Sequence, residues 1–237
     1  MSFPSTRLSI VQRTRSADED TRRLAFATLI DAYWKPAYKY LRLKWRLSPD
    51  EAADLTQEFF TTTLENDVLG RFDPSRARFR TYLRLCLDGF AANAKKAEGR
   101  LKRGGGTLTI PLDFTSAEGE ISSHEPSVPA DLDELFYREW LRALFEHAID
   151  DLRVEATRSG RAAAFAAFEQ YDLADSPERP TYATLAARLG STSATITNHL
   201  AAMRRDLRAH VLRRLRELTT SDEEYEAEAH RLLGIVR

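Results

Sequence analysis

Apolar residues recur every three or four positions along most of this chain of 237 residues, which is the spacing of one face of an α-helix. The pattern predicts helices over residues 20–47, from Ser48 onward, over 79–96 and again from about residue 131. No segment of useful length alternates apolar and polar residues as a half-buried strand does. The sequence therefore predicts an all-α protein.

Between the helical regions lies a stretch that is poor in apolar residues and rich in acids. Residues 107–134 hold seven Asp and Glu and no Lys or Arg. A segment of this composition buries little core of its own, so we expect an extended acidic linker. The expected organisation is a first helical domain at 1–105, the linker at 106–134, a second helical domain at 135–217 and a C-terminal acidic helix at 218–237.

The charges of the chain nearly cancel, with 35 Lys and Arg against 36 Asp and Glu, but they are segregated. Residues 76–103 carry nine basic side chains and two acids, and residues 193–216 carry six Arg and one acid. Because phosphate contacts need a local positive potential, the two basic blocks indicate partners made of nucleic acid.

The composition favours a cytoplasmic protein without a cofactor. Cys86 is the one cysteine, so no intramolecular disulfide can form. No apolar run has the length of a signal peptide core or a membrane span. The five His residues show no metal-ligand spacing, and no nucleophile lies beside a base. We therefore expect no metal, no cofactor and no enzymatic activity.

Residues 181–206 have the pattern of a helix-turn-helix. Gly190 supplies the tight turn, while Ile196, Leu200 and Met203 give the second helix a buried face. The remaining side chains suit base edges and phosphates in a major groove, although a plain helical hairpin is the alternative for this segment alone. These outward candidates are Thr195, Thr197, Asn198, His199, Arg204 and Arg205.

Three acids share one face of the helix that starts at Ser48. Asp54 and Glu58 are four residues apart, and Glu51 precedes Asp54 by three. Taken alone, this is the pattern of a solvated helix face. Nothing in it indicates a buried pair of carboxylates for acid–base catalysis.

Three segments, in order, resemble the extracytoplasmic-function (ECF) sigma factors of the sigma-70 superfamily. LIDAYWKPAYKYLRLKWRLSPDEAADLTQEFF is similar to the first half of sigma domain two, and FDPSRARFRTYLRLCLDGFAANAKKAEGRLKRGGG to its second half. The helix-turn-helix resembles sigma domain four. The resemblance implies a bacterial transcription initiation factor that binds core RNA polymerase and directs it to the −10 and −35 elements of promoter DNA.

The resemblance also assigns roles to residues. The flap of the polymerase and the −35 element would bind domain four, and the linker would pass toward the active-site channel. The clamp coiled coil of the polymerase would contact Glu51, Asp54, Leu55, Gln57, Glu58 and Phe59. The −10 element would be bound and melted by Phe72, Arg76, Arg78, Arg80, Tyr82, Asn93, Lys96 and Arg100, of which Tyr82 could equally be a core residue.

The chain departs from the family pattern in both DNA-binding segments. Gly89 and Asn93 stand where the family often has Asn and Asp, and Thr197 and His199 stand where it often has Lys and Arg. Two other functions therefore stay open. One is a stand-alone helix-turn-helix regulator, and the other is a regulatory adaptor that keeps the sigma fold without binding DNA.

An anti-sigma factor is a further candidate partner. Two hypotheses about regulation also follow from the sequence. A Ser/Thr kinase is a candidate because threonines cluster beside the expected polymerase-binding face, and a phosphate there would add negative charge. The C-terminal helix is expected to dock on domain four or on the linker and restrain the free protein. The clustered threonines are Thr56, Thr61, Thr62 and Thr63.

Overall fold

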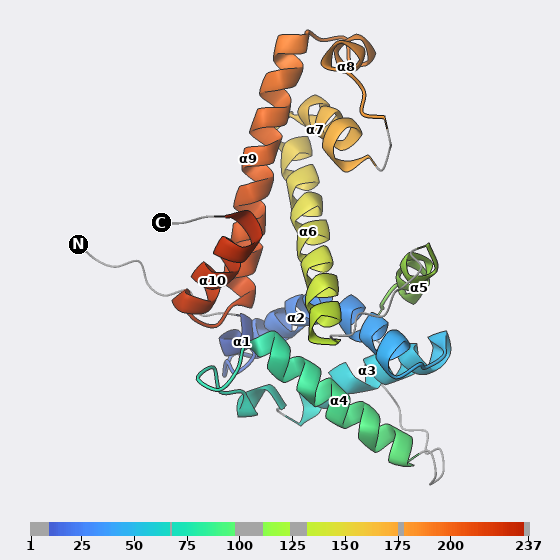
Figure 1. The fold of residues 1–237 in the computed structure, drawn as a ribbon. Helices are drawn as coiled ribbons and strands as arrows, with labels where there is room; N and C mark the ends of the chain where they lie inside the picture. The colour runs from blue at the N-terminus through green and yellow to red at the C-terminus, as the bar shows by residue number, and fades with distance from the viewer. Residues whose placement is uncertain (1–9, 67, 98–110, 124–131, 175–177, 235–237) are drawn as a thin grey trace, which may run out of the picture. The chain divides into compact units, whose positions relative to one another are not determined.

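A computed structural model describes residues 10–66, 68–97, 111–123, 132–174 and 178–234. Within these ranges the regular structure is helical and contains no strand, so the all-α prediction is confirmed for them (Figure 1). In the same ranges no helix combines the length and the apolar character needed to cross a membrane.

The described residues form ten α-helices and two further helical turns. The α-helices are α1 (Ile10–Arg13), α2 (Glu19–Lys44), α3 (Pro49–Glu65), α4 (Phe79–Ala97), α5 (Phe114–Ser123), α6 (Leu132–Arg158), α7 (Ala162–Phe168), α8 (Tyr182–Arg188), α9 (Ser193–Leu218) and α10 (Asp222–Leu233). A 3-10 turn, η1 (Val68–Arg71), and a π turn, η2 (Glu169–Leu173), complete the elements.

The chain divides into two compact units. Unit 1 comprises Met1–Ala143 together with Arg216–Arg237, and unit 2 comprises Leu144–Leu215. These boundaries do not coincide with those expected from the sequence. The C-terminal segment groups with the N-terminal unit, and the start of the expected second domain does so too.

Unit 1 is built around α2, whose buried residues include five aromatic side chains. Tyr33 meets Phe79 of α4 edge to face with ring centroids 5.7 Å apart, and Tyr40 meets Phe136 of α6 at 5.6 Å. Such edge-to-face pairs add to the stabilisation that apolar burial gives. The large side chains that are fully buried in unit 1 include Leu29, Tyr38, Leu41, Phe60, Leu69, Leu83 and Trp140.

The start of α3 confirms the predicted capping at Ser48. The hydroxyl of Ser48 accepts from the backbone N–H of Glu51, and the Glu51 carboxylate accepts from the backbone N–H of Ser48. Pro49 occupies the first helical position, where its missing N–H is no loss. The hydrogen bonds from Ser48 lower the pKa of Glu51. This capping box fixes where α3 begins and therefore which of its residues face outward.

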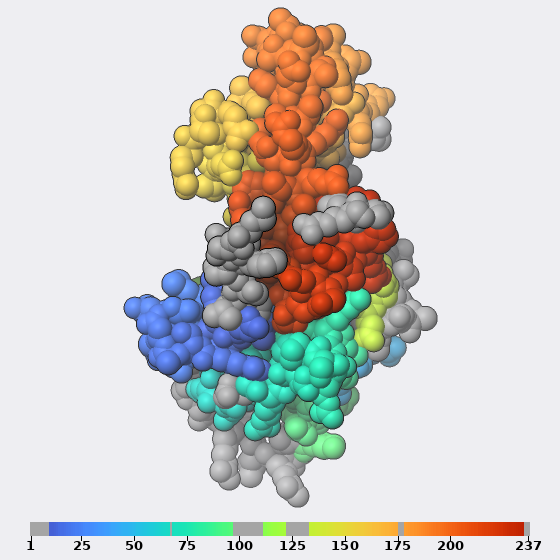
Figure 2. All heavy atoms as spheres, turned by 90° about the vertical axis from the view of Figure 1, so that its left-hand side faces the viewer, coloured from blue at the N-terminus to red at the C-terminus, as the bar shows by residue number. Residues whose placement is uncertain are grey.

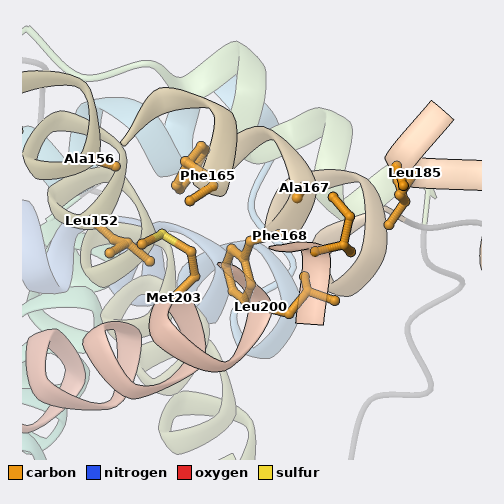
Figure 3. Close-up of a cluster of buried hydrophobic side chains, with 11 residues drawn as sticks. Leu152, Ala156, Phe165, Ala167, Phe168, Leu185, Leu200 and Met203 are labelled. Carbon is orange, nitrogen blue, oxygen red and sulfur yellow. The ribbon is translucent and has the colours of Figure 1, made fainter. Parts of the chain in front are cut away.

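Unit 2 has its own hydrophobic core, which α6, α7, α8 and α9 build together (Figure 3). Gly190 adopts a positive φ of 59° between α8 and α9, a conformation that glycine reaches without steric cost. α9 then starts at a Thr192 cap, whose hydroxyl accepts from the backbone N–H of Thr195. The buried side chains are Leu152, Ala156, Ala164, Phe165, Ala167, Phe168, Leu185, Ala186, Ile196, Leu200 and Met203.

Part of the expected extended linker is a helix, so the prediction of an extended chain is wrong for residues 114–123. Asp113 caps α5, because its carboxylate accepts from the backbone N–H of Ser116. Phe114 packs against Trp34 and Tyr38 of α2, with ring centroids 5.5 and 5.1 Å apart. The helix therefore buries its few apolar groups on α2 and needs no core of its own.

Candidate functional site

The acidic face of α3 lies on the surface of unit 1. Glu51, Asp54 and Glu58 are exposed, as their helical spacing predicts. Leu55 and Gln57 are half-buried between this face and the core. α3 thus presents three carboxylates to solvent along one side of a rigid helix.

Phe59 lies on the opposite side of α3, in the core. Its ring meets Phe60 at 5.2 Å and Phe90 of α4 at 5.7 Å, and its side chain is almost fully buried. Phe59 therefore supports the acidic face from behind and holds α3 against α4.

Two aromatic candidates of the basic block lie among core side chains. Phe72 is buried and packs against Phe79 and Tyr82, with centroids 5.2 and 5.3 Å apart. Tyr82 is half-buried, and its hydroxyl donates to the carbonyl oxygen of Val68 at 2.6 Å. Burial raises the pKa of Tyr82 to about 12. Both rings therefore tie α4 to η1, and stacking on a base would require them to move.

The remaining −10 candidates that the structure describes lie on α4 or just before it, and they fall into two groups. Arg76, Asn93 and Lys96 are exposed, so they are accessible to a phosphate backbone. Arg78 and Arg80 instead form ion pairs with Glu228 of α10. Arg100 lies outside the described residues.

Asp88 organises the surface of α4, and it was not among the residues singled out from the sequence. Its carboxylate accepts from Arg84 at 2.9 Å, from Lys44 at 2.7 Å and from the indole N–H of Trp45 at 3.1 Å. The hydroxyl of Tyr40 donates to it as well, at 3.0 Å. As one of two acids in a basic block, Asp88 was visible in the sequence, but its role in fixing α4 to α2 required the fold.

The first turns of α9 present the polar side chains expected of a recognition helix. Thr197, Asn198 and Arg205 are exposed, whereas Thr195 and His199 are half-buried. The hydroxyl of Thr197 donates to the carbonyl oxygen of Ser193 at 3.0 Å. Of the six outward candidates, Thr195 and His199 are therefore less accessible than their helical spacing indicates.

Arg204 is held within unit 2 by groups outside the predicted set. Its guanidinium donates twice to the Asp172 carboxylate, with both distances at 2.9 Å, and lies over the ring of Tyr171. These hydrogen bonds raise the pKa of Arg204 above its ordinary value. Arg204 keeps 47% of its side chain exposed, so Asp172 orients it at the surface rather than burying it.

Three of the four clustered threonines are buried. Thr56, Thr61 and Thr63 lie in the core of unit 1, and the hydroxyl of Thr56 donates to the carbonyl oxygen of Ala52 at 2.6 Å. Thr62 is half-buried. A kinase acting on the folded unit would therefore meet Thr62, and the other three hydroxyls would become accessible only if α3 left the core.

The docking of α5 on α2 depends on a carboxylate. The guanidinium of Arg42 donates two hydrogen bonds to the Glu118 carboxylate, at 2.5 and 2.8 Å. The Tyr38 hydroxyl donates a third hydrogen bond to the same carboxylate at 2.8 Å. The Arg42 hydrogen bonds hold the pKa of Glu118 below its ordinary value of 4.5, although burial opposes them. The stabilisation is therefore complete above that ordinary value and is lost as the pH falls through the lower pKa of the folded state.

We accordingly expect the Glu118→Gln variant to lose about 1–2 kcal/mol of unfolding free energy at neutral pH. The difference from the unsubstituted protein should shrink as the pH falls from about 4.5 through the lower pKa of the folded state, below which the carboxylate is protonated in both states. Urea unfolding can be followed by tryptophan fluorescence, since Trp34, Trp45 and Trp140 all belong to unit 1. Glu65→Gln at the exposed end of α3 is the control, and an equal loss there would contradict the assignment.

No group of three or more His, Cys, Asp and Glu is placed to hold a metal ion within the described ranges. Comparison with protein families, with curated proteins and with solved structures finds no match for this chain. The site is therefore interpreted from its own side chains: an acidic face on α3, a basic helix α4 and a helix-turn-helix formed by α8 and α9.

Proposed function

We propose that this chain is a transcription initiation factor of the ECF sigma type, which binds core RNA polymerase through α3 and promoter DNA through α4 and α9. The observation that carries the proposal is the sidedness of α3. Its three acids face solvent while Phe59 anchors the helix to the core. A rigid, charged helix face suits a protein partner with complementary charge better than it suits DNA.

Two further features support a DNA-binding role. α9 offers an exposed amide at Asn198, near its start, which can pair with adenine, and an exposed guanidinium at Arg205, near its middle, which can contact phosphate. In unit 1, exposed Arg76 just before α4 and exposed Lys96 on α4 add further cations. The chain therefore carries two sets of exposed basic or polar side chains suited to DNA and one acidic helix face suited to a protein partner. A sigma factor needs both kinds of surface, because it binds promoter DNA and core polymerase.

Reversing the charge of the acidic face tests the polymerase contact. We expect Asp54→Lys combined with Glu58→Lys to weaken binding to sigma-free core polymerase by at least about 100-fold, because like charges would then meet at the interface. The readout is the Kd from fluorescence anisotropy of labelled protein titrated with core. Glu19→Lys combined with Asp20→Lys makes the same charge change on an exposed turn of α2 and should bind normally. Equal affinity of both variants would contradict the proposal.

A stand-alone helix-turn-helix regulator is the second candidate, and the separate core of unit 2 favours it. Such a regulator commonly binds DNA as a dimer, with two recognition helices one helical turn of DNA apart. Sedimentation equilibrium of the free protein and of its DNA complex distinguishes the two. A dimer that binds duplex DNA tightly without polymerase would favour the regulator, whereas a monomer that needs core would favour the sigma function.

A further inference from the structure

A carboxylate on the C-terminal helix is fully buried. Half of the residues of α10 are exposed, but Glu228 has no accessible surface and Ala229 beside it is almost as deeply buried. Burying a carboxylate is unfavourable unless cations and hydrogen-bond donors compensate for the lost water. The surroundings of Glu228 therefore indicate what α10 is docked on.

The compensating groups come from α4, from the residue just before it and from the first turns of α6. Arg80 donates to the Glu228 carboxylate at 2.7 Å, and Arg78 forms a second ion pair with the same oxygen. The other oxygen accepts from the hydroxyl of Tyr137 at 3.0 Å. Figure 2 shows the red surface of α10 lying on the blue-green surface of α4. The C-terminal helix thus covers part of the basic block.

Further contacts fix both ends of α10. Arg231 lies over the ring of Tyr137, 3.9 Å from its centroid, and pairs with Glu134 at 3.4 Å. At the other end, Ser221 caps the helix, and Arg216 lies over the ring of Tyr225. α10 is therefore held along its length in one position on unit 1, and Glu228 is the buried point of that contact.

Arg78 and Arg80 belong to the basic block that would face promoter phosphates. A guanidinium binds carboxylate and phosphate oxygens with the same planar hydrogen-bonding geometry. The N–H groups that Arg78 and Arg80 direct at Glu228 are not available to a phosphate while α10 is docked. Arg80 is additionally fixed by stacking, with its guanidinium 4.5 Å from the ring centroid of Tyr137 and 5.2 Å from that of Trp140. Arg80 is thus already oriented to bind an anion, and in this structure the anion that both arginines contact is the Glu228 carboxylate.

We propose that α10 is an internal competitor of DNA: Glu228 occupies the phosphate position on Arg78 and Arg80, and α10 must leave before this face of α4 can bind the promoter. The inference rests on the proposed function, because it regulates the same surface. The contacts with Tyr137 and Glu134 lie in the two segments on which the C-terminal helix was expected to dock, whereas the two cations come from outside those segments, from Arg80 of α4 and from Arg78 just before it.

The experiment measures the affinity of the full chain for a fluorescein-labelled single-stranded DNA of mixed sequence, by anisotropy. Glu228→Gln keeps the shape of the side chain and removes its charge, and it should raise the affinity about tenfold. Ala229→Gln disturbs the packing of α10 without touching the arginines and should raise it similarly. Glu223→Gln removes one charge from an exposed position of α10, so its affinity should stay within about twofold of the unsubstituted protein.

Amide hydrogen exchange of α10 shows whether each variant releases the helix. Faster exchange in Glu228→Gln and Ala229→Gln together with tighter DNA binding is the expected result, and adding Arg78→Ala should remove the gain. Released α10 with unchanged DNA affinity would overturn the inference. Unchanged exchange in both variants would overturn it too, because Glu228 would then not hold the helix.

The failure of this inference can be told apart from failure of the proposed function. The unsubstituted chain and the variants are also titrated with core polymerase. If core binds while the DNA affinities do not change, the competitor role of α10 fails and the sigma function stands. If core does not bind any of them, the proposed function fails, whatever α10 does.

Discussion

Replacing Lys39 with Ala is expected to lower the unfolding free energy of unit 1 by about 3–5 kcal/mol, because it removes the buried ammonium group that Glu120 and Glu139 share. Lys35 then remains beside Glu120 at 3.0 Å, and of the described residues only Arg142, at 3.4 Å, remains beside Glu139. The Lys39 side chain is only 3% exposed, and its ammonium group lies 2.5 Å from Glu120 and 2.6 Å from Glu139. Glu139 is itself buried. The three charges join α2, α5 and α6, so the loss should appear as earlier unfolding of the whole unit.

Urea unfolding followed by tryptophan fluorescence measures this effect in unit 1. The matched control is Arg22→Ala, which breaks an exposed ion pair with Glu19 on the same helix and should change stability by less than about 1 kcal/mol. Lys39→Met combined with Glu139→Leu tests the reason, because an apolar pair of similar volume should restore much of the stability. A small loss for Lys39→Ala would show that water or other groups satisfy the carboxylates.

Replacing Phe168 with Ala should lower the stability of unit 2 by about 3–5 kcal/mol. The ring is almost fully buried in the cluster where Leu200 and Met203 of α9 meet α7 (Figure 3). Removing it leaves a cavity that the helices cannot close without moving α9, which we propose binds DNA. The expected result is therefore a loss of stability together with weaker binding of duplex DNA.

Amide hydrogen exchange of α7, α8 and α9 measures the stability of unit 2, because tryptophan fluorescence does not report on it. Phe168→Leu retains most of the buried volume and should cost about 1–1.5 kcal/mol. Val154→Ala, at an exposed position of α6, should cost less still. If Phe168→Ala were no worse than Val154→Ala, unit 2 would not depend on this core.

The sequence predicted the long helices of the fold because their apolar spacing is strong and their caps are local. The Ser48 capping box and the Gly190 turn need only neighbouring residues, so both appear in the structure as expected. α5 was missed because its stability comes from elsewhere in the chain. Phe114 and Glu118 have their partners on α2, and no local pattern reveals such a contact.

The candidate site could be predicted in outline but not in its contacts. Exposed Asp54 and Asn198 follow from helical spacing alone. The burial of Phe72 does not, because it depends on Phe79 and Tyr82 closing around it. Likewise, the pairing of Arg80 with Glu228 joins residues 148 positions apart, which only the packing of α10 brings together. Local patterns thus identify surfaces, while long-range packing decides which side chains are available on them.

The central claim is tested most directly by transcription from core polymerase. The purified chain, and Glu228→Gln in parallel, are mixed with sigma-free core and fragmented host DNA, and the 5′ ends of the transcripts are mapped. The account predicts new starts that share a two-part upstream sequence and that disappear with the Asp54→Lys, Glu58→Lys variant. An absence of new starts together with no binding of core by either protein would contradict it.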